Sequence, residues 1–257
     1  MSTSLDFTVK KISKKDAQQS YCCMTEVPTP WPKALCQCRD WVAENLGIHV
    51  DGYHLLDPDS EVIGHIYYAA STKALIPYQV EPGVCVLYCE WVQQRYQKQG
   101  LGKRLFDSLL SDQEKEKAKG ILIETTDIPG QMHYSHYLKR GFKILEEFGH
   151  QKLMFLPILS ETVAVERRQP KIQPRKGTPV EIHILRGFLC PYEVSTQILV
   201  REVSKEFGNK VRLEEIWLTT ETLEKYGISC GILINGKHKL SGGEPERAVR
   251  QAILEEF

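Results

Sequence analysis

Two glycines separated by one residue stand between a strand-like segment and a helix-like segment. The segment 84–92 has the apolar pattern of a strand, and Gln97-x-x-Gly100-x-Gly102 leads from it to an amphipathic stretch that begins at Leu101. Glycines let a backbone approach a phosphate closely, and a helix N-terminus supplies unpaired N–H donors at the positive end of its dipole. The pattern could therefore bind a pyrophosphate, although two glycines alone also fit a tight turn. No Gly-Lys-Ser/Thr sequence is present here, which excludes an ATP-binding P-loop.

Cysteines are the second kind of reactive side chain, and the sequence contains eight of them. Cys22 and Cys23 are adjacent, and Cys36 and Cys38 are two residues apart, on segments that we expect to be helical. Side chains at these spacings diverge on a helix, and neither spacing matches a zinc knuckle. We therefore expect no metal site, and we expect most of the cysteines to be buried thiols in a reducing cytosol.

The elements that position the glycine motif alternate between strands and helices. Short apolar runs bounded by turn residues indicate strands, a proline near the first turn opens one helix, and Gly141 ends another. The expected strands of the first part are 7–12, 61–69, 84–92, 120–125, 142–147 and 152–158, and the expected helices are 15–24, 31–46, 101–117 and 131–139.

A stretch rich in proline and basic residues separates this part from a smaller one. We predict three regions: a first domain at 1–160, a linker at 161–179 and a second domain at 180–257. The second domain is expected to have the element order βαβαββα, with Asn235-Gly236 as a hairpin turn between two short strands. This order predicts one mixed sheet with helices on both faces. The chain as a whole is thus of the α/β class with mixed sheets.

The first part closely resembles the GNAT acetyltransferase superfamily over residues 5–158. The glycine pattern is similar to the family's Gln/Arg-x-x-Gly-x-Gly/Ala motif, and Tyr137-Leu-Lys-Arg-Gly-Phe142 is similar to its Tyr-x-x-x-Gly-Phe signature after the next strand. The resemblance implies a GNAT-like acyltransferase domain with acetyl-coenzyme A as the donor. The adjacent Cys22 and Cys23, with the long C-terminal part, also resemble a bacterial subgroup that has a YoaP-like extension.

The resemblance further implies how the donor is held. Backbone amides near 97–102 would bind its pyrophosphate, and the strand end at Glu90–Val92 would separate from its neighbour, so that the Val92 backbone binds the thioester and the pantetheine arm. The implied binding residues are Trp91, Val92, Gln97, Lys98, Gln99, Gly100, Leu101, Gly102 and Lys103.

Acetyl transfer to an amine requires a base for the amine and an acid for the departing thiolate. Glu90, at the strand end, could be the base, and Tyr137 could be the acid. Glu90 could instead be a solvated charge, and Tyr137 could serve only to pack its ring. His133 lies four residues before Tyr137, on the same helix face, so His133 or the neighbouring Tyr134 could replace Tyr137.

The second part contains Cys190-Pro-Tyr-Glu193 between a strand and a helix. This motif resembles the Cys-Pro-Tyr-Cys of glutaredoxins, and the element order is thioredoxin-like. A thiol at a helix N-terminus is more acidic and more nucleophilic. Glu193 replaces the second cysteine, and Cys230 stands near the position where the family has a proline. Cys190 and Cys230 could therefore form a thiol pair. Alternatively, the domain could serve only to recognise a substrate or a partner.

Composition narrows the choice of function. Lys plus Arg and Asp plus Glu both number 33, and this zero net charge argues against a general nucleic-acid binder. No apolar run is long enough for a membrane span, and no signal pattern begins the sequence, so we expect a cytoplasmic protein. We predict direct acetyl transfer to a primary amine, most simply a small molecule. The alternatives are a coenzyme A-binding or thiol-sensing protein without turnover, and a thiol-disulfide enzyme. The sequence does not determine the oligomeric state, and a homo-oligomer is one of the options.

Overall fold

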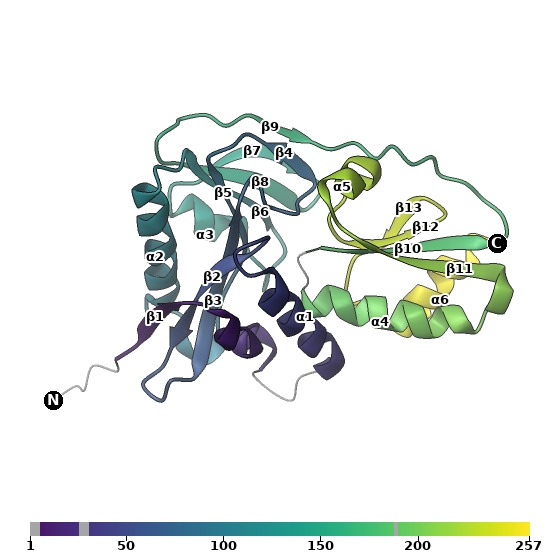
Figure 1. Ribbon diagram of the computed structural model, residues 1–257, viewed down its shortest axis with the longest axis horizontal. Helices are drawn as coiled ribbons and strands as arrows, with labels where there is room; N and C mark the ends of the chain where they lie inside the picture. The colour runs from purple at the N-terminus through teal and green to yellow at the C-terminus, as the bar shows by residue number, and fades with distance from the viewer. Residues whose placement is uncertain (1–5, 26–30, 188–189) are drawn as a thin grey trace. The chain divides into compact units, whose positions relative to one another are not determined.

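The computed structural model describes residues 6–25, 31–187 and 190–257. Contacts between residues divide the chain into two compact units (Figure 1). The first unit holds residues 1–28, 42–74 and 80–165, and the second holds residues 29–41, 75–79 and 166–257. The domain boundaries predicted from the sequence stay a prediction. No helix in the described ranges is long and apolar enough to cross a membrane.

A seven-stranded sheet forms the centre of the first unit. Its strands lie in the order β1-β2-β3-β5-β6-β8-β7, and β5 and β6 are its only parallel neighbours in the described chain. The bounds are β1 Thr8–Lys11, β2 Asp51–Leu56, β3 Val62–Ala70, β5 Val84–Val92, β6 Gly120–Thr126, β7 Lys143–Phe148 and β8 Gln151–Pro157.

Helix α2 (Leu101–Lys115) covers one face of this sheet. It buries Leu101, Leu105 and Leu109, which are spaced by four residues and therefore lie on one side of the helix. Gly100 precedes the helix with a φ of +80°, a conformation that glycine adopts without a steric penalty. The strand-glycine-helix order predicted for this part is confirmed.

The end of β5 separates from β6. The two strands pair only from Val84 opposite Gly120 to Leu87 opposite Ile123, whereas β5 continues to Val92. The register against β3 also shifts at Tyr88, between the pairs Tyr68–Leu87 and Tyr67–Cys89. The predicted opening beside Glu90 is thus confirmed, because the bulge and the end of pairing turn the last residues of β5 away from β6.

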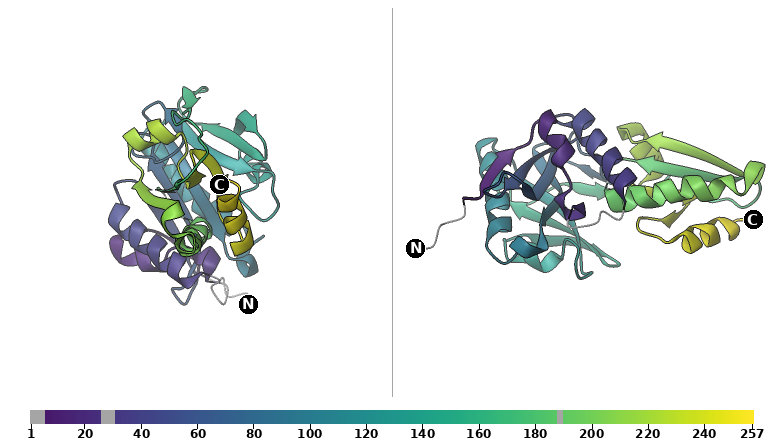
Figure 2. Two further views of the ribbon diagram at one scale, coloured as in Figure 1. Left: turned by 90° about the vertical axis from the view of Figure 1, so that its right-hand side faces the viewer. Right: turned by 90° about the horizontal axis from the view of Figure 1, so that it is seen from below.

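Four strands form the sheet of the second unit, in the order β11-β10-β12-β13, with β10 parallel to β11 and the other pairs antiparallel. Helices α4 and α6 lie on one face of the sheet and α5 on the other (Figures 1 and 2). The order βαβαββα is confirmed. The bounds are β10 Val180–Arg186, α4 Pro191–Lys205, β11 Val211–Trp217, α5 Thr220–Tyr226, β12 Gly231–Ile234, β13 Lys237–Leu240 and α6 Glu246–Leu254.

The hairpin between β12 and β13 turns as predicted. Asn235 and Gly236 have φ angles of +50° and +77°, and two successive positive values are typical of a type I′ turn. Asn235 is buried, and its side-chain oxygen accepts a hydrogen bond from the Glu181 N–H at 2.9 Å. This contact ties the turn to β10.

Four features of the local structure differ from the expectations. The helix predicted at 15–24 is instead two short 3-10 helices, Lys14–Gln19 and Cys22–Met24, because Tyr21 between them has a φ of +61°. The helix predicted at 131–139 is shorter, α3 (Tyr134–Leu138), whereas α1 (Pro32–Asn45) begins close to where its proline predicts. Strand β2 was not predicted, and the predicted linker contains β9 (Val165–Arg167), which pairs with β4 (Tyr78–Val80).

Candidate functional site

A row of backbone donors leads into α2. The Gln97 N–H donates to the Gln94 carbonyl, and the Arg104 N–H donates to the Gly100 carbonyl. Between them, the N–H groups of residues 98–103 have no acceptor within the described part of the chain. Lys98, Gln99 and Gly100 are exposed, so a ligand can reach this row. Six adjacent donors at a helix N-terminus can hold a diphosphate.

The strand end beside this row is held by Gln97. The Gln97 side-chain amide donates to the Val92 carbonyl at 2.8 Å. Two residues that were predicted to bind coenzyme A, Gln97 and Val92, therefore bind each other. Trp91, the neighbour of Val92, has a buried indole N–H without an acceptor in the described ranges. The Lys103 ammonium pairs with Asp107 at 2.6 Å on the surface of α2. The predicted residues therefore lie together, but Gln97 and Lys103 have partners within the chain.

The opening between β5 and β6 contains a weakly bonded donor. The Glu90 N–H points to the Met132 sulfur at 3.3 Å. A thioether is a weak acceptor, and a methionine side chain is flexible. A carbonyl oxygen that displaced the sulfur would form a stronger hydrogen bond with this N–H group.

The Glu90 carboxylate does not face open solvent. It accepts two hydrogen bonds from the Arg140 guanidinium, at 2.5 and 2.7 Å, and its side chain is 8% exposed. Burial alone would lower the pKa of Arg140, but the hydrogen bonds with Glu90 outweigh burial and raise it. Both oxygens of the Glu90 carboxylate are therefore engaged by Arg140. Arg140 lies within the Tyr137–Phe142 motif, and sequence reasoning gave it no role.

Tyr137 lies beside this ion pair and is buried. Its ring contacts Phe142 edge to face, with centroids 5.5 Å apart, and the Arg140 guanidinium lies 5.5 Å from the ring centre. Burial first, and then the negative charge of Glu90, raise the pKa of Tyr137 well above 10. Its hydroxyl has no hydrogen-bond partner within the described chain, so the phenol stays protonated and gives up its proton reluctantly.

The two alternatives to Tyr137 have other contacts. His133 is the N-cap of α3, where its Nδ1 accepts a hydrogen bond from the Ser135 N–H at 3.3 Å. The ring of Tyr134 contacts the Lys152 ammonium, 5.1 Å from its centre. His133 therefore lies just before α3, where it caps the helix.

The order of these elements and motifs agrees with a comparison against protein families. Residues 18–142 match the acetyltransferase (GNAT) family. This part of the chain is a GNAT acetyltransferase domain. A search of curated proteins finds no match.

Several solved structures are similar to the GNAT domain. PaiA N-acetyltransferase from Thermoplasma acidophilum, in complex with coenzyme A, is 16% identical, with a TM-score of 0.43 over 60% of this chain and 100% of that chain. A GNAT family acetyltransferase from Staphylococcus aureus is 12% identical, with a TM-score of 0.45 over 60% and 100%. A GNAT family N-acetyltransferase from Escherichia coli, in complex with coenzyme A, is 14% identical, with a TM-score of 0.44 over 61% and 84%.

A buried cluster of two thiols and an imidazole lies in the GNAT domain behind the β5 opening. His65 on β3 has its Nδ1 3.2 Å from the Cys22 sulfur and its Nε2 3.6 Å from the Cys89 sulfur. His65 and Cys22 are fully buried, and Cys89 is half-buried. The sequence indicated no partner for Cys22, and it did not indicate that His65 and Cys89 lie beside it. Alternating positions of β3 and β5 could have suggested a shared face.

The burial of His65 gives the GNAT domain a specific sensitivity to acid. Burial, and then the neighbouring His54, lower the pKa of His65 to about 3, whereas an unfolded histidine has a pKa of about 6.5. The unfolded chain therefore binds more protons between these two values, and stability falls as the pH drops through this window. We expect His65 to cost about 2 kcal/mol of unfolding free energy between pH 7 and pH 5.

Urea unfolding at pH 7 and pH 5 measures this effect. The wild-type protein should lose more stability than His65→Gln, whose amide has no comparable titration. His136→Gln, at an exposed position of α3, is the matched control and should behave like the wild type. Equal losses for the wild type and His65→Gln would contradict a buried neutral imidazole.

The second unit carries the predicted thiol pair. Cys190 is the N-cap of α4, Cys230 directly precedes β12, and both are half-buried and outside any disulfide. Residues 188–189, which precede Cys190, lie outside the described residues. A Cβ atom at Gly187 would lie 2.8 Å from the Ser229 carbonyl oxygen, so the backbones leading to the two cysteines are in contact.

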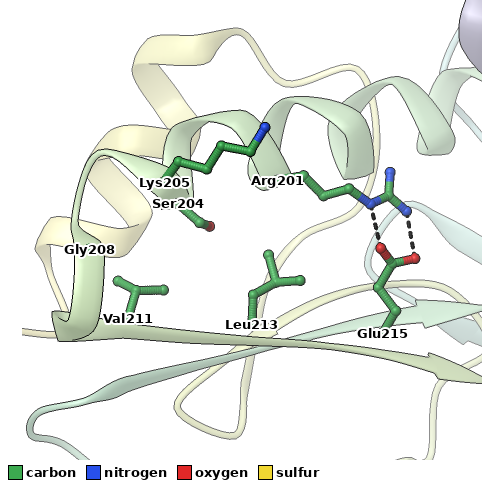
Figure 3. A pocket seen from close by; sticks show the side chains of 7 residues that line it. All are labelled: Arg201, Ser204, Lys205, Gly208, Val211, Leu213 and Glu215. Atoms are coloured by element: carbon green, nitrogen blue, oxygen red, sulfur yellow. Dashed lines mark hydrogen bonds and ion pairs between the residues drawn. The ribbon is translucent and has the colours of Figure 1, made fainter.

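A hollow of about 400 Å³ lies between α4 and β11 (Figure 3). Arg201 donates two hydrogen bonds to Glu215 there, at 2.6 and 2.7 Å. Lys205 pairs with Glu202 at 2.8 Å. Both cations that line the hollow are thus neutralised, and we assign it no ligand. No group of three or more metal-binding side chains was found in the described ranges.

Proposed function

We propose that the GNAT domain transfers an acetyl group from acetyl-coenzyme A directly to a primary amine of a small-molecule acceptor. The observation that carries this proposal is the row of unpaired N–H groups at 98–103, directly after the opened end of β5. The row suits a diphosphate, and the open strand edge suits the amide-containing pantetheine arm. The residues present thus fit coenzyme A as a co-substrate.

The chemistry needs a polarised thioester, a neutral amine and a proton for the departing thiolate. The Glu90 N–H, released from the Met132 sulfur, is our candidate donor to the thioester oxygen. Glu90 as base and Tyr137 as acid stay predictions from the sequence. The ion pair of Glu90 with Arg140 argues for a role in fixing the strand end, and the raised pKa of Tyr137 argues against fast proton donation.

Calorimetry with acetyl-coenzyme A, followed by a thiol-release assay with a panel of amines, tests the proposal. We expect micromolar or tighter binding and release of coenzyme A with at least one small primary amine. Binding without release for every amine would favour the alternative, a coenzyme A-binding or thiol-sensing protein. Absence of binding would contradict the assignment of the phosphate row.

We further infer that the second unit has a thioredoxin-like, YoaP-like fold that assists acceptor recognition. Its element order and strand order support this inference, as does a cysteine at the N-cap of α4. The eight reduced cysteines are consistent with a reducing, cytoplasmic location. Glu193 in place of a second motif cysteine argues against disulfide reduction as the main activity.

The pairing of Cys190 with Cys230 has a direct test. The rate at which iodoacetamide alkylates Cys190 should depend on pH differently in the wild type and in Cys230→Ser, because a neighbouring thiol changes the ionisation of Cys190. Cys36→Ser, at an exposed position, is the control. The pairing would be contradicted if Cys190 showed the same pH profile of alkylation in the wild type and in Cys230→Ser, and if that profile were the one of an ordinary exposed thiol.

A further inference from the structure

The Cys22–His65–Cys89 cluster reaches the opening where the proposed reaction takes place. Cys89 immediately precedes Glu90, on the part of β5 that no longer pairs with β6. The Cys89 sulfur contacts His65 at 3.6 Å. Cys89 thus links the buried cluster to the reaction site.

The hydrogen-bonding state of His65 depends on which of the two thiols is the donor. A neutral imidazole has one N–H donor and one acceptor nitrogen, and the partner of one nitrogen decides the state of the other. We assign the donor role to the Cys22 thiol, which is buried 3.2 Å from Nδ1, and this assignment places the imidazole proton on Nε2. The Nε2–H group then points at the Cys89 sulfur. A hydrogen bond of this kind stabilises a thiolate on Cys89.

We propose that Cys89 shuttles the proton from the acceptor nitrogen to the sulfur of the departing coenzyme A, and that His65 and Cys22 position its thiol. This proposal rests on the proposed acetyl transfer. A bond forms between the amine nitrogen and the acetyl carbon, and the bond from that carbon to the sulfur breaks. Cys89 gives its proton to the coenzyme A sulfur and takes one from the nitrogen, so no net proton is gained or lost.

Cys89 suits this step better than Tyr137 does. The donor and the recipient are both thiols, so the transfer between them is close to balanced in energy. Tyr137 would have to lose a proton against its raised pKa, with no partner for its hydroxyl in the described chain. His65 cannot take the shuttling proton itself, because burial keeps its imidazole neutral.

Affinity labelling with bromoacetyl-coenzyme A tests the location of Cys89 without turnover. The Cys89 sulfur would displace bromide from the reagent, its thiol proton would pass to solvent, and peptide mass mapping would find the adduct on Cys89. Excess coenzyme A should prevent this label. An adduct elsewhere, or none on Cys89 while calorimetry detects coenzyme A binding, overturns the proposal. Absence of coenzyme A binding would instead contradict the proposed function, and this proposal with it.

Kinetics with an amine accepted by the wild type tests the role. Cys89→Ala should lower kcat about 100-fold, as expected for the loss of one proton-transfer group, while KM for acetyl-coenzyme A stays within about twofold. Cys89→Ser should recover part of the loss, and Tyr137→Phe should keep kcat within about threefold of the wild type. Cys36→Ala, at an exposed position, is the matched control. Normal kcat in Cys89→Ala, or a larger loss in Tyr137→Phe, overturns the proposal.

Two further variants test the positioning role of Cys22. Cys22→Ser keeps a donor for Nδ1 of His65, and Cys22→Ala removes it while leaving less side chain in the same buried position. We expect Cys22→Ser to retain most of kcat and Cys22→Ala to lower kcat about tenfold, within the range for a lost supporting group. Equal kcat in the two variants overturns the role of Cys22, whatever their melting temperatures.

Discussion

Gly102→Glu is expected to abolish binding of acetyl-coenzyme A. A Cβ atom at Gly102 would lie 3.3 Å from a Glu90 carboxylate oxygen and 3.6 Å from the Arg140 guanidinium. The added carboxylate would therefore stand beside Glu90, in front of the donors that are proposed to hold the diphosphate. Repulsion between these charges in a partly buried place should raise the dissociation constant by at least about 100-fold, or about 2.7 kcal/mol. Calorimetry with acetyl-coenzyme A measures this change.

Gly102→Ala is the matched control. Its methyl group fits at 3.3 Å with a small shift of the Glu90 side chain, and it adds no charge. Its affinity should stay within about tenfold of the wild type, a change of about 1.4 kcal/mol. Circular dichroism should show both variants folded. Near-normal affinity in folded Gly102→Glu would remove the phosphate-binding assignment.

Arg140→Met should cause a large loss of stability in the GNAT domain. The substitution leaves the Glu90 carboxylate, with a side chain that is 8% exposed, without its guanidinium partner. Breaking a buried ion pair by removing one partner costs about 3–5 kcal/mol, because the other charge stays buried. Urea unfolding at pH 7 should therefore show a drop of about this size in the free energy of unfolding.

A double variant and a surface control separate the ion pair from other effects. Adding Glu90→Gln to Arg140→Met removes the stranded charge and should recover at least half of the loss. Lys143→Met breaks an exposed pair with Glu161 and should change stability by less than about 1 kcal/mol. A loss in Arg140→Met as small as that in Lys143→Met would show that the pair contributes little.

Local sequence signals predicted the glycine loop, and the resemblance to the GNAT superfamily implied the opened strand end. The loop depends on residues that are neighbours in the chain. A glycine directly before an amphipathic stretch is visible in the sequence, and the structure gives this glycine a positive φ. Strand β2 gave no such signal, because Asp51, Gly52 and His54 interrupt its apolar residues although most of the strand is buried. The 3-10 segments at 14–24 share side-chain spacing with a helix, and only the left-handed Tyr21 distinguishes them.

The contacts that decide the chemistry lie far apart in the chain. Arg140 and Glu90 are separated by 50 residues, and Cys22 and His65 by 43. Whether these residues come into contact depends on the register of β3 against β5 and on the position of α3. Sequence patterns determine neither the register nor the position of the helix to within one residue. A one-residue change in register would turn His65 to the other face of the sheet. Glu90 was therefore predicted as an accessible base, whereas its carboxylate is occupied by Arg140.

A nuclear magnetic resonance titration of the amide protons with coenzyme A tests most directly whether the N–H groups of residues 98–103 hold the diphosphate. We predict that the amide signals of residues 98–103 move downfield together, as expected for N–H groups that gain phosphate acceptors, and that these signals stay in place in Gly102→Glu. The Glu90 amide should move as well, because the ligand displaces Met132. Binding that leaves the signals of residues 98–103 unchanged would contradict the central claim that these donors hold the diphosphate.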